Sequence, residues 1–211
     1  MGFPAMHKLI ALSALFVSSA FAGYTVTYTG APPAEAAAHA SLVSDKGIRI
    51  LKEGGSVLMD LWFVKTLPGG GEVEDNTAFP NLPNGALLAI AHFPEKHTDR
   101  RGQTIKPGVY TLRYSRYPVN GDHMGVAPQR DFAVLSLAGK DPDPAAQPNF
   151  AKLMSMSRVA SGTPHPLVLS IWQEDKAPES AIEEFAENET IFHTRIGITE
   201  FAIIIAGVHE G

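Results

Sequence analysis

Residues 105–137, IKPGVYTLRYSRYPVNGDHMGVAPQRDFAVLSL, predict two β-strands that are joined by a polar loop. In the first half the side chains alternate, so that Tyr110, Leu112 and Tyr114 share one face of an extended chain. A period of two with aromatic side chains on one face is typical of a half-buried strand. A second run of β-forming residues begins at Asp131. The stretch therefore predicts two adjacent strands with the chain reversed between them.

The loop between these strands carries the densest group of chemically reactive side chains in the sequence. Its Asn120-Gly121 dipeptide tolerates positive φ at successive positions, which predicts a chain reversal. Loops that are held by rigid strands often carry function. We predict that the charged and aromatic side chains around the loop form a ligand-binding surface: Asp122, His123, Arg130, Asp131 and Tyr117. In the structural alternative, these side chains only fix the loop, and the arginine pairs with the aspartate that follows it.

Residues 106–114, KPGVYTLRY, resemble a strand-opening pattern of secreted bacterial β-sandwich proteins. In that pattern a proline and a glycine precede a Tyr-Thr-Leu or Tyr-Ser-Leu strand. The resemblance is confined to this segment, and it implies a β-sandwich fold and an exported protein. It assigns no catalytic residue and does not extend to the loop that follows.

The N-terminal 22 residues are typical of a secretory signal peptide. His7-Lys8 supplies the positive segment, residues 9–18 form the apolar core, and Ala20-Phe21-Ala22 is a small-x-small cleavage site. The apolar run is too short to span a bilayer comfortably. We therefore expect cleavage before Gly23 and export to the periplasm or the extracellular space, with residues 23–211 forming a single β-rich domain.

Composition excludes several classes of function. The chain has 17 Lys and Arg against 22 Asp and Glu, for a net charge of −5, and it contains no basic cluster. An acidic chain of this kind argues against nucleic acid as a partner. The absence of cysteine removes thiol catalysis, iron–sulfur clusters and cysteine-bound zinc, so an exported chain must rely on its hydrophobic core. No stretch after the leader is long and apolar enough for a membrane helix.

Short runs of β-forming residues recur between Gly- and Pro-rich turns along the rest of the chain. Besides the pair described above, strands are predicted at residues 24–28, 47–51, 57–64, 86–93, 166–172, 191–198 and 200–208. Nine or ten strands with few helices predict a mainly β fold, an antiparallel β-sandwich or jelly-roll-like domain with one or two short helices. A closed barrel of the lipocalin kind is the alternative.

Two short helices are predicted. The first covers residues 34–43 and places His39 on an exposed surface. The second covers residues 150–160 and begins after Asn149, a residue type that favours the N-cap position. The acidic stretch 174–189 is predicted as a short helix or a loop.

One carboxylate is expected inside the sheet. In the strand predicted at residues 57–64, Asp60 shares a face with Trp62 and other apolar side chains. A buried carboxylate is costly unless it is paired and hydrogen-bonded. A cationic partner is therefore predicted for it, either Arg113 or Arg130.

The segment HFPEKH at residues 92–97 raises the alternative of a metal site. Its spacing matches neither HExxH nor HxxEH, and its proline disfavours the helix on which those motifs depend. A site with His92 and His97 needs a further ligand, and His123 is the first candidate. His92 ends a predicted strand and is expected near the rim of the sheet that carries the loop. Imidazoles with a carboxylate such as Asp122 suit Zn or Cu. In the structural alternative, these are surface histidines at a strand end.

The sequence contains no P-loop, no Rossmann glycine fingerprint and no nucleophile elbow. The leading hypothesis is an exported, non-catalytic binding or accessory domain for a small molecule, a glycan or an envelope protein, with no cofactor. The alternative is a metal-assisted enzyme or a metal-binding protein that uses the His and Asp cluster with Zn or Cu. The sequence leaves open whether the protein catalyses a reaction.

Overall fold

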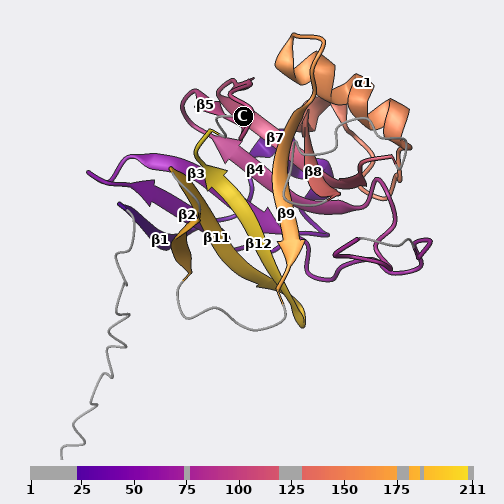
Figure 1. The fold of residues 1–211 in the computed structure, drawn as a ribbon, viewed down its shortest axis with the longest axis horizontal. Helices are drawn as coiled ribbons and strands as arrows, with labels where there is room; N and C mark the ends of the chain where they lie inside the picture. The colour runs from indigo at the N-terminus through magenta and orange to yellow at the C-terminus, as the bar shows by residue number, and fades with distance from the viewer. Residues whose placement is uncertain (1–22, 74–76, 119–129, 175–180, 186–187, 209–211) are drawn as a thin grey trace, which may run out of the picture.

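The computed structural model describes residues 23–73, 77–118, 130–174, 181–185 and 188–208 (Figure 1). The strands are β1 Tyr24–Thr29, β2 Gly47–Lys52, β3 Val57–Phe63, β4 Leu87–Phe93, β5 His97–Thr98, β6 Thr104–Ile105, β7 Gly108–Arg116, β8 Asp131–Leu137, β9 Leu167–Gln173, β10 Ile182–Phe185, β11 Glu189–Ile196 and β12 Thr199–Ala206. The helices are the 3-10 helices η1 Ala34–His39 and η2 Ala138–Lys140 and the α-helix α1 Phe150–Ser161. None of the described helices is long and apolar enough to cross a membrane.

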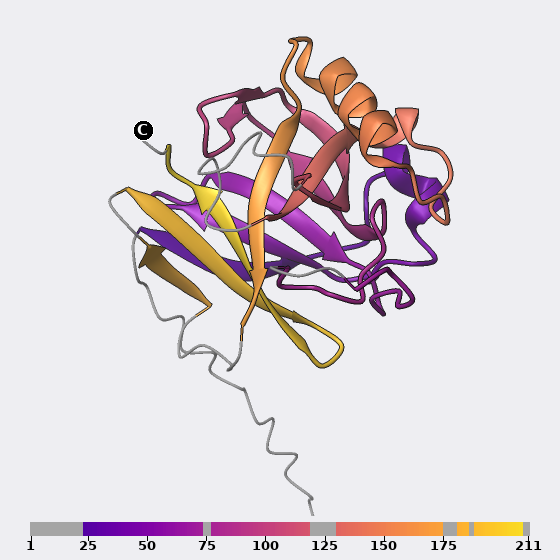
Figure 2. The same cartoon turned by 45° about the vertical axis from the view of Figure 1, so that its right-hand side comes forward.

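Within the described residues, ten strands form one antiparallel sheet in the order β1-β2-β3-β4-β7-β8-β9-β12-β11-β10. β5 and β6 form a small separate hairpin. The large sheet curls until β1 contacts β10, which gives the molecule a nearly barrel-like shape (Figures 1 and 2). The prediction of a mainly β, antiparallel fold with few short helices is therefore confirmed.

β7 and β8 form the strand pair that the central stretch of the sequence predicts. They are antiparallel, with a register that runs from Tyr110 opposite Leu137 to Arg116 opposite Asp131. β4 lies on the other side of β7, and β9 lies on the other side of β8. The pair therefore occupies the middle of the sheet, where all of its backbone groups can find partners in neighbouring strands.

Both faces of β7 are buried. On the inner face, Tyr110, Leu112 and Tyr114 are at most 1% exposed within the main core, as predicted. On the outer face, Thr111 and Arg113 are also fully buried, so the prediction of a half-buried strand is wrong. The reason is tertiary, because η1, η2 and α1 pack on the outer side of the sheet around β7 and β8 (Figure 2). Alternation within one strand gives no information about whether distant segments of the chain pack over its polar face.

The main core fills the inside of the curled sheet. Phe79, from the long connection between β3 and β4, packs against Tyr114 and Phe201 with ring centroids 5.9 and 4.9 Å apart. Phe63 lies 6.4 Å from the ring of Phe201, so that aromatic contacts join strands from distant parts of the sequence. Since the chain has no cysteine, this buried apolar surface is the main stabilising feature of the fold.

α1 covers the outer face of β8 and β9. It begins after Asn149, whose side chain accepts a hydrogen bond from the backbone N–H of Lys152 at 3.0 Å. It ends at Gly162, whose φ of 72° is a left-handed conformation that glycine adopts without strain. Leu153 is fully buried in a second apolar cluster with side chains of β8 and β9. The helix and its cap are therefore confirmed as predicted.

Two local predictions are wrong. The helix predicted at 34–43 is a 3-10 helix that ends at His39, and this histidine is fully buried rather than exposed. It is buried because η1 packs against both β7 and η2. The stretch 174–189, predicted as a short helix or a loop, contains β10, which pairs with β11. Pairing with a formed strand overrides the weak local preference of this acidic segment.

Candidate functional site

Three members of the predicted loop site, Tyr117, Arg130 and Asp131, lie together where β7 ends and β8 begins. The Nε and Nη2 atoms of Arg130 donate to the backbone carbonyl of Tyr117 at 3.0 and 2.9 Å. Asp131 is fully buried, and its carboxylate accepts hydrogen bonds from the Tyr114 hydroxyl at 2.5 Å and from the backbone N–H of Ala78 at 2.8 Å. Asp131 therefore ties the connection between β3 and β4 to the sheet.

His92 and His97 are held by separate partners. His92 on β4 lies opposite Val109 at the start of β7, and its Nδ1 atom is 3.3 Å from the carboxylate of Asp60. The Nε2 atom of His97 is 2.8 Å from the backbone carbonyl of Ile205. Burial lowers the pKa of His97. Each imidazole is therefore engaged within its own part of the fold.

The expectation that His92 shares a rim of the sheet with the predicted loop is wrong. β4 runs antiparallel to β7, so β4 ends where β7 begins, whereas the loop follows the end of β7. Those ends are a strand length apart, at roughly 3.3 Å per residue. Among the described residues, no group of three or more His, Asp or Glu is placed to hold a metal ion. Asp122 and His123 lie outside the described residues, so the Zn or Cu hypothesis stays a prediction about them.

The buried carboxylate of β3 has a partner that the sequence analysis missed. Arg49 on β2 lies directly opposite Asp60 and binds its two oxygens through Nε at 2.6 Å and Nη2 at 2.9 Å. The prediction of Arg113 or Arg130 as the partner is wrong. The reason is the strand order, because β2 is the neighbour of β3, whereas β4 separates β3 from β7.

Arg113 has all five of its N–H donors in hydrogen bonds and is fully buried. Its Nε and Nη2 atoms bind the two carboxylate oxygens of Asp141 at 2.6 and 3.0 Å. The remaining donors reach the backbone carbonyls of Gly85 at 2.8 Å, Asp143 at 2.7 Å and Ala146 at 2.6 Å. This side chain therefore fastens the segment between η2 and α1 to the outer face of β7.

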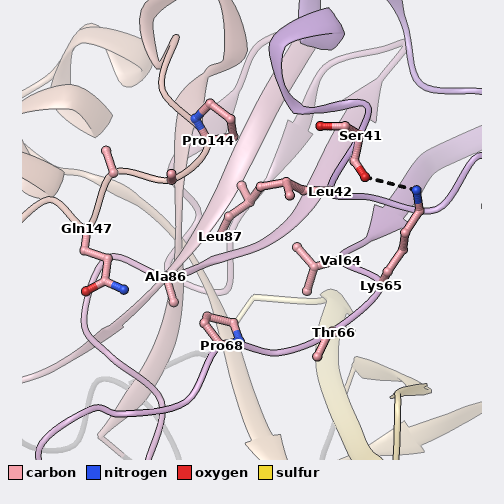
Figure 3. Close-up of a pocket in the computed structure, with 12 residues that line it drawn as sticks. Ser41, Leu42, Val64, Lys65, Thr66, Pro68, Ala86, Leu87, Pro144 and Gln147 are labelled. Carbon is pink, nitrogen blue, oxygen red and sulfur yellow. Dashed lines mark hydrogen bonds between the residues drawn. The ribbon is translucent and has the colours of Figure 1, made fainter.

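Beside this fastened segment lies a cleft with a volume of about 300 Å³ (Figure 3). Its walls come from the turn after η1, the chain leaving β3, the start of β4 and the segment between η2 and α1. The lining residues are Ser41, Leu42, Val64, Lys65, Thr66, Pro68, Ala86, Leu87, Pro144, Ala145, Ala146 and Gln147. The cleft is therefore mostly aliphatic, with one lysine, one amide and two hydroxyl groups.

Contacts within the protein fix both walls of the cleft. The backbone N–H of Lys65 donates to the carbonyl of Leu42 at 2.9 Å, and its Nζ atom donates to the carbonyl of Ser41 at 3.0 Å. The opposite wall, the segment between η2 and α1, is held by the hydrogen bonds of Arg113. At Gly85, where φ is +84°, a Cβ atom would lie 2.5 Å from the carbonyl oxygen of Pro148. Only glycine lets this wall approach the start of β4 so closely.

No sequence signal marks the cleft, because its residues are common aliphatic and small polar types from segments that lie far apart between positions 41 and 147. Only the folded sheet brings these segments together. Comparison of the chain with protein-family models, curated proteins and solved structures found no match. The function is therefore inferred from the geometry of the cleft and the pattern of the sequence.

His39 is the last residue of η1 and precedes by two residues the wall of the cleft that begins at Ser41. His39 is fully buried, and neither of its ring nitrogens meets hydrogen-bond geometry with another described residue. Burial lowers the pKa of His39, while the charge of Asp141 opposes this shift and the charge of Arg113 adds to it. Burial therefore favours the neutral form of this imidazole in the folded protein. Its protonation would place a second cation close to Arg113.

Proposed function

We propose that the protein is an exported, non-catalytic domain that binds a small molecule in the cleft between η1, β4 and the segment before α1. The observation that carries this proposal is the cleft itself, which has a volume of about 300 Å³, a mostly aliphatic lining and hydrogen-bonded walls. Small-molecule sites in proteins are concave, mostly apolar and largely preformed, with a few polar groups that orient the ligand. The cleft has each of these properties.

The lining supports binding rather than catalysis. Its most reactive side chains are Ser41 and Lys65, and the lysine amine donates to the backbone carbonyl of Ser41. Figure 3 shows the Ser41 hydroxyl turned away from that amine. None of the described lining residues is His, Asp or Glu. A nucleophile with an adjacent general base, the usual arrangement for covalent catalysis, is therefore missing from the described lining.

Export is part of the same proposal and is supported by the charged, apolar and small-residue segments of positions 1–22. The first strand, β1, begins at Tyr24. Cleavage before Gly23 would therefore leave every described strand in place. A chain without cysteine is also compatible with export, because the buried core rather than disulfides holds the fold together.

The proposal is tested by the binding of a neutral apolar fluorophore, N-phenylnaphthylamine, to the purified protein. Ala145 lines the cleft and is exposed, so Ala145→Trp should occupy the cleft without entering the core. Ala151→Trp, at an exposed position of α1 outside the lining, is the matched control. We expect the first variant to weaken binding by about fivefold or more, since overfilling a formed site costs about 1–3 kcal/mol. Unchanged binding in Ala145→Trp would show that the cleft is not the site.

A further inference from the structure

The cleft carries one positive charge that no described carboxylate neutralises. Lys65 is the single charged residue among those that line it. Its Nζ atom donates to the carbonyl of Ser41 at 3.0 Å, and an ammonium group has two further donors to offer. Lys65 is exposed, and none of the ion pairs within the described part of the chain includes it, although the protein as a whole has a net charge of −5.

The remainder of the cleft is apolar, with an uncharged polar group at the far end. Gln147 lies across the cleft from Lys65, and the side chains of Val64, Ala86 and Leu87 lie between them (Figure 3). A ligand that spans the cleft therefore meets a cation at one end, aliphatic groups along its length and an amide at the other end.

We propose that the ligand is a small amphiphile with an apolar body and a single carboxylate that pairs with Lys65. This inference rests on the proposed function of the cleft. A hydrogen bond from an ammonium to a carboxylate is stronger than one between neutral groups, so the head group determines orientation. Phosphate esters and dicarboxylates fit less well, because one lysine is a point charge without the forked donors of arginine. The apolar part of the ligand would be stabilised because the aliphatic side chains of the cleft remove it from water.

The experiment compares octanoate with octanol as competitors of N-phenylnaphthylamine, because these two molecules share a chain and differ in their head group. Octanoate is expected to bind more tightly than octanol to the wild-type protein. Because Lys65 is exposed, Lys65→Gln should weaken octanoate binding roughly two- to fivefold more than octanol binding, since loss of the Ser41 contact affects both competitors and loss of the charge affects only octanoate. Lys152→Gln, at an exposed position of α1 outside the cleft, should change neither affinity. Higher ionic strength should reduce the preference for octanoate.

The outcomes separate this inference from the proposed function. If octanol binds as tightly as octanoate, or if Lys65→Gln weakens both competitors equally or neither of them, the carboxylate assignment is overturned and the cleft remains a binding site. If the fluorophore does not bind, or if it binds Ala145→Trp as tightly as wild type, the proposed function of the cleft is itself contradicted. Selective loss of octanoate binding in Lys65→Gln supports both.

Discussion

Replacing Arg113 with methionine should destabilise the protein by about 3–5 kcal/mol, the usual cost of removing one partner from a buried ion pair. Methionine keeps much of the aliphatic volume of arginine and removes the guanidinium group. The Asp141 carboxylate, which is 3% exposed, would then keep the Thr111 hydroxyl at 2.7 Å but lose its counter-charge. A buried carboxylate without a cation is costly because the protein interior solvates charge poorly.

The cost does not come from the ion pair alone. The carbonyls of Gly85, Asp143 and Ala146 would each lose a donor that lies 2.6–2.8 Å away in the native protein. A buried acceptor that loses its donor costs about 1–3 kcal/mol when water cannot replace it. Ala146 lines the cleft, and the segment that contains it is mostly exposed, so water can satisfy part of this loss. We therefore expect the total to stay within the range for a buried ion pair, and binding in the cleft to weaken as its wall loosens.

The assay is urea unfolding followed by tryptophan fluorescence, with the slope of the transition compared between variants. Arg158→Met, which removes an exposed arginine on α1, is the matched control and should cost about 1 kcal/mol or less. The double variant Arg113→Met with Asp141→Leu should be more stable than the single variant, because it removes the unpaired charge. A loss below about 1 kcal/mol in Arg113→Met, or a double variant no more stable than the single one, would refute this account.

Three further predictions concern the core, pH and processing. Leu112→Ala should cost about 2–5 kcal/mol in urea unfolding, since Leu112 is 1% exposed, and a loss within measurement error would contradict its burial. Because burial lowers the pKa of His39 below its usual 6.5, the unfolded chain binds a proton that the fold does not, so stability should fall as pH drops below about 6.5. His39→Leu should remove that part of the pH dependence. If the free energy of unfolding of His39→Leu changes with pH as steeply as that of the wild type, the role of His39 is contradicted. Mass spectrometry of the protein from its native host should show Gly23 as the N-terminus, whereas a retained leader would overturn export.

The parts of the fold that follow from the sequence are those set by interactions between near neighbours in the chain. Alternation of Tyr110, Leu112 and Tyr114 correctly predicted both the β7 strand and its core-facing side. Asn149 correctly predicted the start of α1, because an N-cap depends on a backbone N–H only three residues away. Such patterns determine which segments become strands and helices, and therefore the class of fold.

The candidate site depends on contacts that no local pattern records. Asp60 finds Arg49 only because β2 lies beside β3 in the strand order, and His39 is buried only because η1 packs on β7 and η2. The cleft also depends on tertiary contacts, since its aliphatic residues form a binding surface only where separate segments of the chain meet. The sequence alone thus determines a mainly β antiparallel protein with a capped helix. The tertiary structure decides where its charges are paired and where its cleft lies, because burial and pairing depend on neighbours that are distant in the chain.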